Sequence, residues 1–395
     1  MSASAESLIV SLQPSEKARG ASPIKSFERV FATKLRAVRS PTSALVFISG
    51  ANELAGDVAA SVARLAPGAR ALVVPSRGVL SELAEIEGAA AASALIWSGP
   101  KPRVELGASA LEGGEGGTRL LFPGSSIGAA DLAAVRGAST IGGTAAGDTI
   151  WAVEEGRVVS ASVAALVVSG QGAPVVEQSS SCRVIAPPLL VTRSSKRGAV
   201  QALRASEGAR ASEPAAIVQR TQEPSGASEI LELDGAPALE MLSKTVGRVG
   251  QPGLIVFSVV PADAPERLLF RTIKGVDPSK KAILVDADIQ AGDRLVLASR
   301  DATHARTDLA EAARRAEQRA LGSAPRFALF VSCAARGRSL YREPDVDVKI
   351  LKKRFPKLPI AGMHAGLQII PWGPDDRSVA LQQMSGVLGL FRAPS

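Results

Sequence analysis

The sequence predicts an α/β protein with layered, mixed β-sheets, flanking helices and two related halves. The first observation is an apolar run at residues 44–48, followed by an amphipathic helical pattern and a second apolar run at 70–74. The second is a similar alternation near the other end, where an apolar run at 327–331 precedes a helix and a further strand. The third is the length of 395 residues with 46% hydrophobic residues, which suits two domains with buried cores.

Turn residues separate the elements of the first half. The strand at 44–48 ends at Ser49-Gly50, and Pro67-Gly68 stops the helix before the strand at 70–74. That helix is indicated by apolar residues at helical spacing: Leu54, Val58, Val62 and Leu65. Further strands are expected at 94–97, 119–122, 149–153 and 162–168.

The second half is more regular. Asp301 or Thr303 can cap a helix that Gly322 ends. Its buried stripe is expected to be Leu309, Ala312, Ala313, Ala316 and Ala320. A second helix is expected at 345–355, where helix capping and hydration explain Asp345 and Asp347 better than catalysis does. Strands are expected at 254–259, 268–273, 281–285, 294–297, 327–331 and 359–361.

Composition divides the chain into four parts. Residues 1–25 are rich in Ser and Ala and are expected to be a disordered leader. Residues 26–192 and 230–395 form the two domains. Between them, residues 193–229 are rich in Ser, Ala, Arg and Glu without a sustained period, which predicts a flexible insertion or linker.

Net charge, composition and hydropathy argue against nucleic acids and membranes as partners. The net charge is +8, but Lys and Arg are scattered and only 4% of residues are aromatic, which argues against specific nucleic-acid binding. There is neither an apolar stretch of ~20 residues nor a signal-peptide core, so we expect no membrane insertion and a cytoplasmic location.

Metal and cofactor motifs are also lacking. Cys182 and Cys333 are too few for a disulfide framework or a zinc site, and only His304 and His364 could add imidazole ligands. The glycine-rich run at 141–143 lacks the spacing of a dinucleotide-binding loop, so we interpret it as a tight turn or a close backbone contact. We therefore expect no metal and no cofactor.

The most informative segment is Ser-Cys-Ala-Ala-Arg-Gly at residues 332–337. It leaves the carboxyl end of the strand at 327–331, where layered α/β folds tend to bind ligands. Arg336 can present its planar guanidinium to a carboxylate or phosphate, and Gly337 leaves room for the approach. An ordinary solvated loop arginine is the alternative interpretation.

Cys333 has two interpretations. It could be a nucleophile paired with His364, which lies one strand onward. A buried cysteine at a strand end is more often structural, and Ser332 lacks the Gly-x-Ser-x-Gly context of serine hydrolases. We therefore predict no catalytic residue and favour a protein that is not an enzyme, with a thiol-dependent enzyme using Cys333 as the alternative.

Motifs in both halves resemble a known family. In the second half they are residues 271, 275–278, 292–293, 330–337, 340–341, 359–362 and 387–391, which resemble the C-terminal FIST domain. In the first half they are Ser76-x-Gly78-Val79, residues 141–147, Cys182-Arg183 and residues 231–239, which are similar to the N-terminal FIST domain. The match covers residues 40–395 in outline.

The resemblance implies a paired sensory module that recognises a small ligand such as an amino acid. No kinase, receiver, cyclase or F-box pattern accompanies it, so we expect the output to pass through a separate signalling protein. The ligand-binding residues that we predict are Ser332, Cys333, Arg336, Gly337, His364, Gln368, Ser76 and Cys182. A ligand-free interaction adaptor is a further alternative.

Two departures from the family pattern bear on the ligand. Val74-Pro75-Ser76 stands where the family usually has Gly-Cys-Ser, and Leu367-Gln368 stands where it usually has Gly-Glu. The second change removes a carboxylate that would pair with an ammonium group. This counts against an amino-acid ligand and leaves a neutral or anionic one open.

Overall fold

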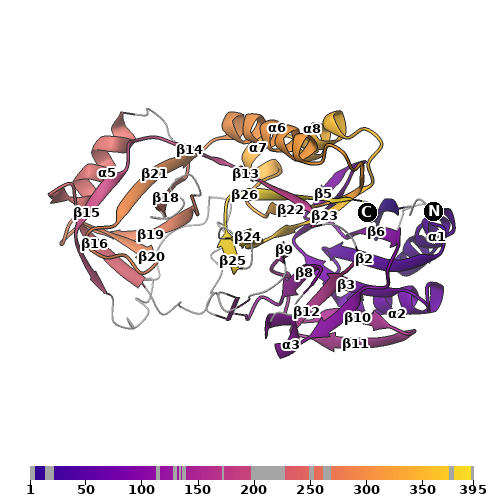
Figure 1. Ribbon diagram of the computed structural model, residues 1–395. Helices are drawn as coiled ribbons and strands as arrows, with labels where there is room; N and C mark the ends of the chain where they lie inside the picture. The colour runs from indigo at the N-terminus through magenta and orange to yellow at the C-terminus, as the bar shows by residue number, and fades with distance from the viewer. Residues whose placement is uncertain are drawn as a thin grey trace. The chain divides into compact units, whose positions relative to one another are not determined.

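The computed structural model (Figure 1) describes most of the chain and divides it into two compact units. The described residues are 5–13, 22–112, 116–127, 131–132, 135, 139–170, 173–196, 227–248, 253–260, 268–372 and 378–392. The first unit is Met1–Arg183 with Arg300–Ser395, and the second is Val184–Ser299. The predicted domain at 230–395 is thus shared between the units. Mixed sheets with flanking helices confirm the predicted α/β class.

Sheet I of the first unit carries helices on one face. Its strands, in spatial order, are β1 (Ala5–Ser11), β6 (Ala91–Ser98), β2 (Pro41–Ser49), β3 (Arg70–Ser76), β10 (Ile150–Glu154) and β11 (Arg157–Ala161). Strands β2 and β3 are parallel and are joined through helix α2 (Ala55–Leu65), which confirms the predicted β-α-β unit. Helix α1 (Pro23–Ala37) buries Phe27 and Phe31 in the same cluster as Val58 and Val62 of α2.

The expected disordered leader is wrong for residues 5–11, which form β1. This strand pairs antiparallel with β6, with Leu8 opposite Ala94, and Leu8 is buried. The physical reason is that the short apolar run at 8–10 covers an apolar sheet edge, a contact that local composition does not reveal. Helix α1 then begins at Pro23, and residues 1–4 and 14–21 lie outside the described residues.

Sheets II and III draw strands from both ends of the chain. Sheet II is β25 (Ser378–Gln382), β24 (Gln368–Trp372), β9 (Ser139–Gly143), β8 (Thr118–Pro123), β12 (Val163–Val168) and β7 (Arg103–Leu106). Sheet III is β13 (Val175–Ser180), β26 (Ser385–Arg392), β22 (Pro325–Cys333), β23 (Ile360–Ala365), β4 (Gly78–Ser81) and β5 (Glu85–Glu87). The hairpin β4–β5 from the first half therefore completes a sheet of the second half.

Helices α6 (Ala302–Arg319) and α8 (Val346–Arg354) cover one face of sheet III (Figure 1). The side chain of Asp301 accepts a hydrogen bond from the backbone N–H of His304, so Asp301 is the N-cap that the sequence suggested. The predicted stripe is buried at Leu309, Ala312, Ala313, Ala316 and Ala320. Helix α8 connects the parallel strands β22 and β23, which repeats the β-α-β arrangement of sheet I.

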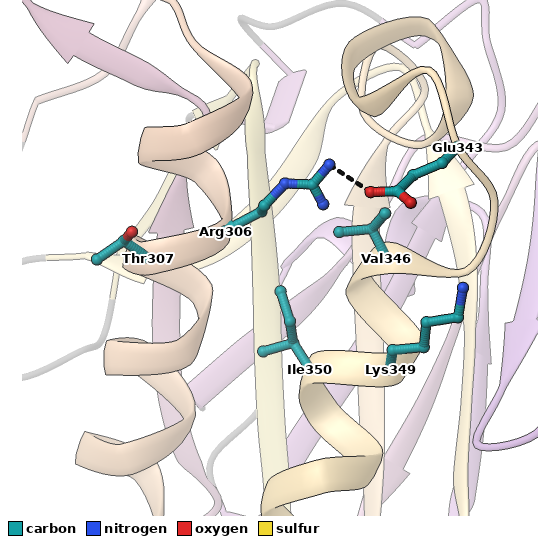
Figure 2. Close-up of a pocket in the computed structure, with 6 residues that line it drawn as sticks. All are labelled: Arg306, Thr307, Glu343, Val346, Lys349 and Ile350. Carbon is teal, nitrogen blue, oxygen red and sulfur yellow. Dashed lines mark hydrogen bonds and ion pairs between the residues drawn. The ribbon is translucent and has the colours of Figure 1, made fainter.

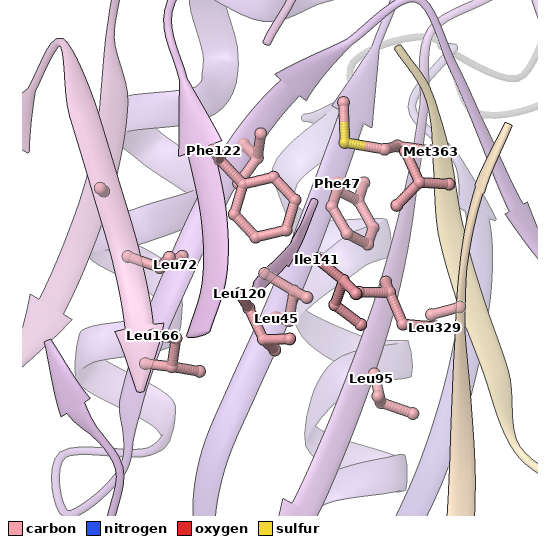
Figure 3. Packing of buried hydrophobic residues seen from close by; sticks show 14 of the residues in the cluster. Leu45, Phe47, Leu72, Leu95, Leu120, Phe122, Ile141, Leu166, Leu329 and Met363 are labelled. Atoms are coloured by element: carbon pink, nitrogen blue, oxygen red, sulfur yellow. The ribbon is translucent and has the colours of Figure 1, made fainter. Parts of the chain in front are cut away.

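The three sheets share one apolar core. Figure 3 shows Phe47 and Phe122 from the first half beside Leu329 and Met363 from the second. The Phe47 and Phe122 rings meet edge to face at 5.6 Å, a favourable aromatic geometry. Gly142 lies where β9 approaches β8, because a Cβ there would sit 1.9 Å from the carbonyl oxygen of Leu121. This confirms the close backbone contact that we inferred for the glycine-rich run.

The second unit is built on an antiparallel sheet that closes on itself. Its strands follow the order β21 (Arg294–Arg300), β15 (Leu189–Lys196), β16 (Ala227–Leu233), β20 (Ala282–Asp286), β19 (Arg271–Asp277) and β18 (Ile255–Val259). Strand β18 pairs back to β21. Short strands β14 (Cys182–Val184) and β17 (Ala236–Pro237) join this sheet, and helix α5 (Ala238–Gly247) contributes Ala238 to the core.

The ends of the predicted flexible insertion are ordered. Residues 193–196 belong to β15 and residues 227–229 to β16, and the two strands pair antiparallel with a register shift near Arg193. Residues 197–226 lie outside the described residues. Across the part of the chain that the structure describes, none of the helices has both the length and the apolarity that a membrane crossing requires.

Candidate functional site

The parallel register of β22 and β23 brings the central candidates together. Ser332 lies opposite His364, and Cys333 lies opposite Ala365, at the carboxyl ends of the two strands. The chain then turns through Arg336 and Gly337 into the short helix α7 (Arg338–Tyr341). All of these positions belong to the first unit. The strand-end location predicted from the sequence is therefore where the structure gathers its buried polar groups.

Arg336 is fully buried and uses all five of its N–H groups within the protein. Its Nε and Nη2 donate to the two oxygens of Asp347 at 3.0 and 2.9 Å. Nη2 also donates to the Tyr341 hydroxyl at 2.8 Å, and Nη1 donates to the Ser181 hydroxyl at 2.9 Å and toward the carbonyl oxygen of Ser179 at 3.4 Å. A ligand contact by Arg336 stays a prediction, and it would require one of these bonds to break.

Asp347, on the first turn of α8, accepts hydrogen bonds from several of these residues. We use the name Arg336 network for the hydrogen-bonded set of Arg336, Asp347, Tyr341, Ser332, Ser179 and Ser181. Besides Arg336, Asp347 accepts hydrogen bonds from the hydroxyls of Tyr341 at 2.7 Å and Ser332 at 3.2 Å. Burial opposes ionisation of Asp347, but the Arg336 guanidinium outweighs it and keeps the pKa of this carboxyl below its usual range. The sequence interpretation of Asp347 as a solvated residue near a helix start is wrong, because α8 packs this face against sheet III.

Gly337 lies at a position that favours glycine. Its φ is +64°, in the left-handed region, and a Cβ at this position would lie 2.2 Å from Oε1 of Glu87. The same Glu87 oxygen accepts a hydrogen bond from the backbone N–H of Arg338 at 2.9 Å. Gly337 therefore lets strand β5 approach the turn after β22.

Gly337→Ala is expected to destabilise the protein more than Gly88→Ala. Both glycines have nearly the same φ, +64° and +65°, but a Cβ at Gly88 would meet no atom within 4 Å. The control thus carries only the strain of a positive φ, on the order of 1–2 kcal/mol. Gly337→Ala must in addition adopt a ψ of −145°, which at positive φ is essentially confined to glycine, and displace Glu87. Urea unfolding of both variants measures the difference, and equal losses would contradict the close approach of Glu87.

A second cluster lies beside the Arg336 network and consists of Glu85, Glu87 and His364; we call it the Glu–His cluster. Glu85 and Glu87 alternate along β5, so both carboxylates lie on the same face of that strand. Nε2 of His364 lies 2.9 Å from Oε1 of Glu85, and both side chains are almost completely buried. One ligand atom from each of the three residues lies within 4.8 Å of the other two.

Several polar atoms of the Glu–His cluster lack hydrogen-bond partners among the described residues. They are both carboxylate oxygens of Glu85 and Nε2 of His364. Oε1 of Glu85 and Nε2 of His364 are close to each other, but their contact does not have hydrogen-bonding geometry. Burial raises the pKa of Glu85, and the nearby Asp347 and Glu87 add to this effect. Burial opposes a charged imidazole, but the Glu85 carboxylate outweighs it and raises the pKa of His364. The pair therefore holds protons more tightly than isolated side chains would.

Sequence reasoning found His364 but missed Glu85 and Glu87. It expected no metal-ligand cluster because it considered only cysteines and histidines, while the two carboxylates come from a strand far away in the sequence. The pattern Glu85-Ile86-Glu87 was the available signal, since alternation places both carboxylates on one face of a strand. The position of the β4–β5 hairpin decides which residue these two carboxylates meet. Strand β4 pairs with β23, with Val79 opposite Met363, and this pairing brings β5 close to His364.

Gln368, Ser76 and Cys182 are buried, and the side chains of Gln368 and Ser76 use their hydrogen bonds within the protein. The Gln368 amide donates to the carbonyl oxygen of Ala365 at 3.2 Å, and its oxygen accepts a bond from Ser385 at 2.9 Å. The Ser76 hydroxyl lies 3.0 Å from the carbonyl oxygens of Ile48 and Gly78. Cys182 is an unpaired buried thiol, and burial raises its pKa to about 12.

The geometry does not favour a Cys333–His364 nucleophilic pair. Nδ1 of His364 lies 3.4 Å from the backbone carbonyl oxygen of Cys333, and Nε2 faces Glu85. The Cys333 sulfur instead accepts a weak hydrogen bond from the backbone N–H of Ala335 at 3.4 Å. Both ring nitrogens of the candidate base are thus directed at other atoms, whereas a base must lie within hydrogen-bond reach of its nucleophile.

A groove of about 320 Å³ lies on the surface of the first unit (Figure 2). Helices α6 and α8 and the segment before α8 line it with Arg306, Thr307, Glu343, Val346, Lys349 and Ile350. Arg306 pairs with Glu343 at 2.6 Å, and its guanidinium lies 4.9 Å from the centroid of the Tyr341 ring. Tyr341 therefore connects the groove to the buried Arg336 network. The residues that line this groove do not include any of the ligand-binding residues predicted from the sequence.

Family models match both parts of the chain. The FIST N domain matches residues 42–205, and the FIST C domain matches residues 234–371. This chain belongs to the FIST family. FIST domains are sensory domains, and the resemblance found in the sequence motifs is confirmed.

Curated relatives of this FIST protein occur in mycobacteria. The uncharacterized proteins Mb0898c of Mycobacterium bovis and MT0897 of Mycobacterium tuberculosis are each 28% identical to it over 271 residues. The alignment covers 65% of this chain and 60% of each relative, so the chain spans less than two thirds of the length of these relatives.

Both FIST matches contribute to the buried polar region. Glu85, Glu87 and Ser181 fall within the FIST N match, whereas Arg336 and His364 fall within the FIST C match. Sheet III joins these segments through the pairing of β4 with β23. The Glu–His cluster is thus formed only when the two matched regions fold together in the first unit.

Proposed function

We propose that this FIST protein is a cytoplasmic sensor that binds a small cationic ligand at the Glu–His cluster and acts on a separate signalling protein. The observation that carries the proposal is the buried Glu85 carboxylate: its Oε2 has no hydrogen-bond partner among the described residues, and its Oε1 faces Nε2 of His364 at 2.9 Å without hydrogen-bonding geometry. A buried polar group without a partner costs about 1–3 kcal/mol. A ligand that donates hydrogen bonds or carries positive charge would recover this free energy.

The charge of the cluster supports a cationic ligand. From the sequence, the replacement of a family glutamate by Gln368 left a neutral or anionic ligand open. Glu85 and Glu87 of β5 supply carboxylates close to Gln368. The Gln368 amide donates a hydrogen bond to the carbonyl oxygen of Ala365, and Ala365 directly follows His364 of the Glu–His cluster on β23. The Arg336 guanidinium does not neutralise them directly, because its own carboxylate partner is Asp347.

A thermal-shift screen tests the proposal. The panel contains free amino acids, polyamines, other small amines and divalent metal salts, each tested on the wild type, Glu85→Gln and Glu53→Gln. A ligand at one hundred times its dissociation constant adds about 2.7 kcal/mol to the stability of the folded state. We expect at least one cation to raise the Tm of the wild type and of Glu53→Gln but not that of Glu85→Gln. Glu53→Gln is the control because Glu53 is exposed.

Two results would reject this function. One is a panel in which no compound raises the Tm of the wild type. The other is a stabilising compound that acts equally on Glu85→Gln, which would place its binding elsewhere. Melting of Glu85→Gln without ligand serves as the check that this variant is folded.

A further inference from the structure

The Glu–His cluster offers three metal-ligand groups from two strands of sheet III that β4 separates. His364 lies on β23, and Glu85 and Glu87 lie on β5 at the edge of sheet III. Ligand atoms around a tetrahedral zinc ion at ~2.1 Å would be roughly 3.4 Å from one another. The observed separations are within 4.8 Å, so small side-chain rotations would bring all three groups onto one ion.

Independent evidence for a ligand comes from the buried atoms without partners. Nε2 of His364 and both oxygens of Glu85 have no hydrogen-bond partner among the described residues, and these are the atoms that a metal would use. His364 and Glu85 are both more than nine-tenths buried. A simple structural ion pair would instead be expected to align its N–H with a carboxylate oxygen.

The surrounding groups are arranged as supports for such ligands. Nδ1 of His364 lies 3.4 Å from the carbonyl oxygen of Cys333, which would accept a hydrogen bond from Nδ1 when a metal replaces the proton on Nε2. The backbone N–H of Arg338 holds one oxygen of Glu87 at 2.9 Å. Metal-ligating histidines and carboxylates commonly have this kind of second hydrogen bond, which fixes their orientation.

The donor set selects the class of metal. One imidazole and two carboxylates suit Zn²⁺, which binds His and Glu readily and keeps an open position when a protein supplies three ligands. Ca²⁺ and Mg²⁺ prefer oxygen ligands alone, and copper(I) prefers sulfur. Two carboxylates would also balance the charge of a divalent cation. We infer that the ligand of the Glu–His cluster is a divalent transition metal ion, Zn²⁺ in the first place, bound by Glu85, Glu87 and His364.

This inference rests on the proposed sensor function and is tested by direct binding. Full-length protein is stripped with a chelator, loaded with zinc sulfate, dialysed against metal-free buffer and analysed for bound zinc. We expect one zinc per chain in the wild type and in His304→Gln, which changes a histidine of α6 outside the cluster. Glu87→Gln and His364→Gln should bind zinc at least tenfold more weakly. Glu87 is only half-buried, so Glu87→Gln is the variant less affected by any loss of folding.

Cobalt(II) gives a second measurement, because its visible absorption reports the coordinating atoms. We expect a Co²⁺ spectrum in the wild type that zinc abolishes and that Glu87→Gln does not show. The metal assignment is overturned if wild type and His364→Gln retain the same amount of zinc, or if His304→Gln loses it equally. If zinc does not bind while an amine stabilises the wild type through Glu85, only the metal assignment fails. If neither binds, the sensor proposal fails as well.

Discussion

Asp347→Asn is expected to lower the free energy of unfolding by about 3–5 kcal/mol, because it leaves the guanidinium of Arg336 buried without a counter-charge. Both side chains of this pair are completely buried, so water cannot replace the lost carboxylate. The substitution also removes a negatively charged acceptor from Tyr341 and Ser332. Urea denaturation, with the midpoint and the slope both fitted, measures the loss.

A matched control for this prediction is Glu311→Gln. Glu311 pairs with Arg314 at 2.8 Å on α6, but both side chains are well exposed, and such pairs contribute about 0.2–1 kcal/mol. The double variant Arg336→Met with Asp347→Leu should recover much of the stability that Asp347→Asn loses, because it removes both buried charges. A loss for Asp347→Asn no larger than that of Glu311→Gln would mean that Arg336 reaches solvent.

Phe327→Ala is expected to cost about 3–5 kcal/mol, since it removes a large side chain from the core shared by the three sheets. The Phe327 ring lies 5.1 Å from the ring of Trp97 and stacks on Phe391 at 4.7 Å. Trp97 belongs to sheet I, whereas Phe327 and Phe391 belong to sheet III. The cavity would therefore lie where segments from the first and last parts of the chain meet.

Calorimetric melting and urea unfolding measure the effect of Phe327→Ala. Leu321→Ala is the control, because Leu321 is 77% exposed and surface substitutions change stability by about 0.5 kcal/mol or less. Phe327→Leu should show an intermediate loss because it keeps part of the apolar volume. If Phe327→Ala were as stable as Leu321→Ala, the shared core would not hold sheets I and III together.

Local patterns were sufficient for much of the fold. The apolar runs predicted β2, β3 and β22, and the alanine-rich stripe with Leu309 predicted the buried face of α6. Strand β1 and helix α1 were missed, because the apolar residues that hold them, such as Leu8 and Phe27, become informative only beside the sheet that they cover. The division at Arg183 and Arg300 was missed for a related reason, since the chain leaves the first unit and later returns to it.

The candidate site shows the same distinction. The sequence by itself placed Ser332 at the end of one buried strand and His364 just after the next strand along the chain, because strands follow from short-range hydrophobic patterns. The pairing of these two strands was added by the structure. Only the tertiary structure decided that Asp347 is the buried carboxylate partner of Arg336 and that Glu85 and Glu87 reach His364. Those contacts depend on which strand lies at the edge of sheet III. That choice is made by packing among segments far apart in the sequence, where the free energy comes from burial shared by both halves.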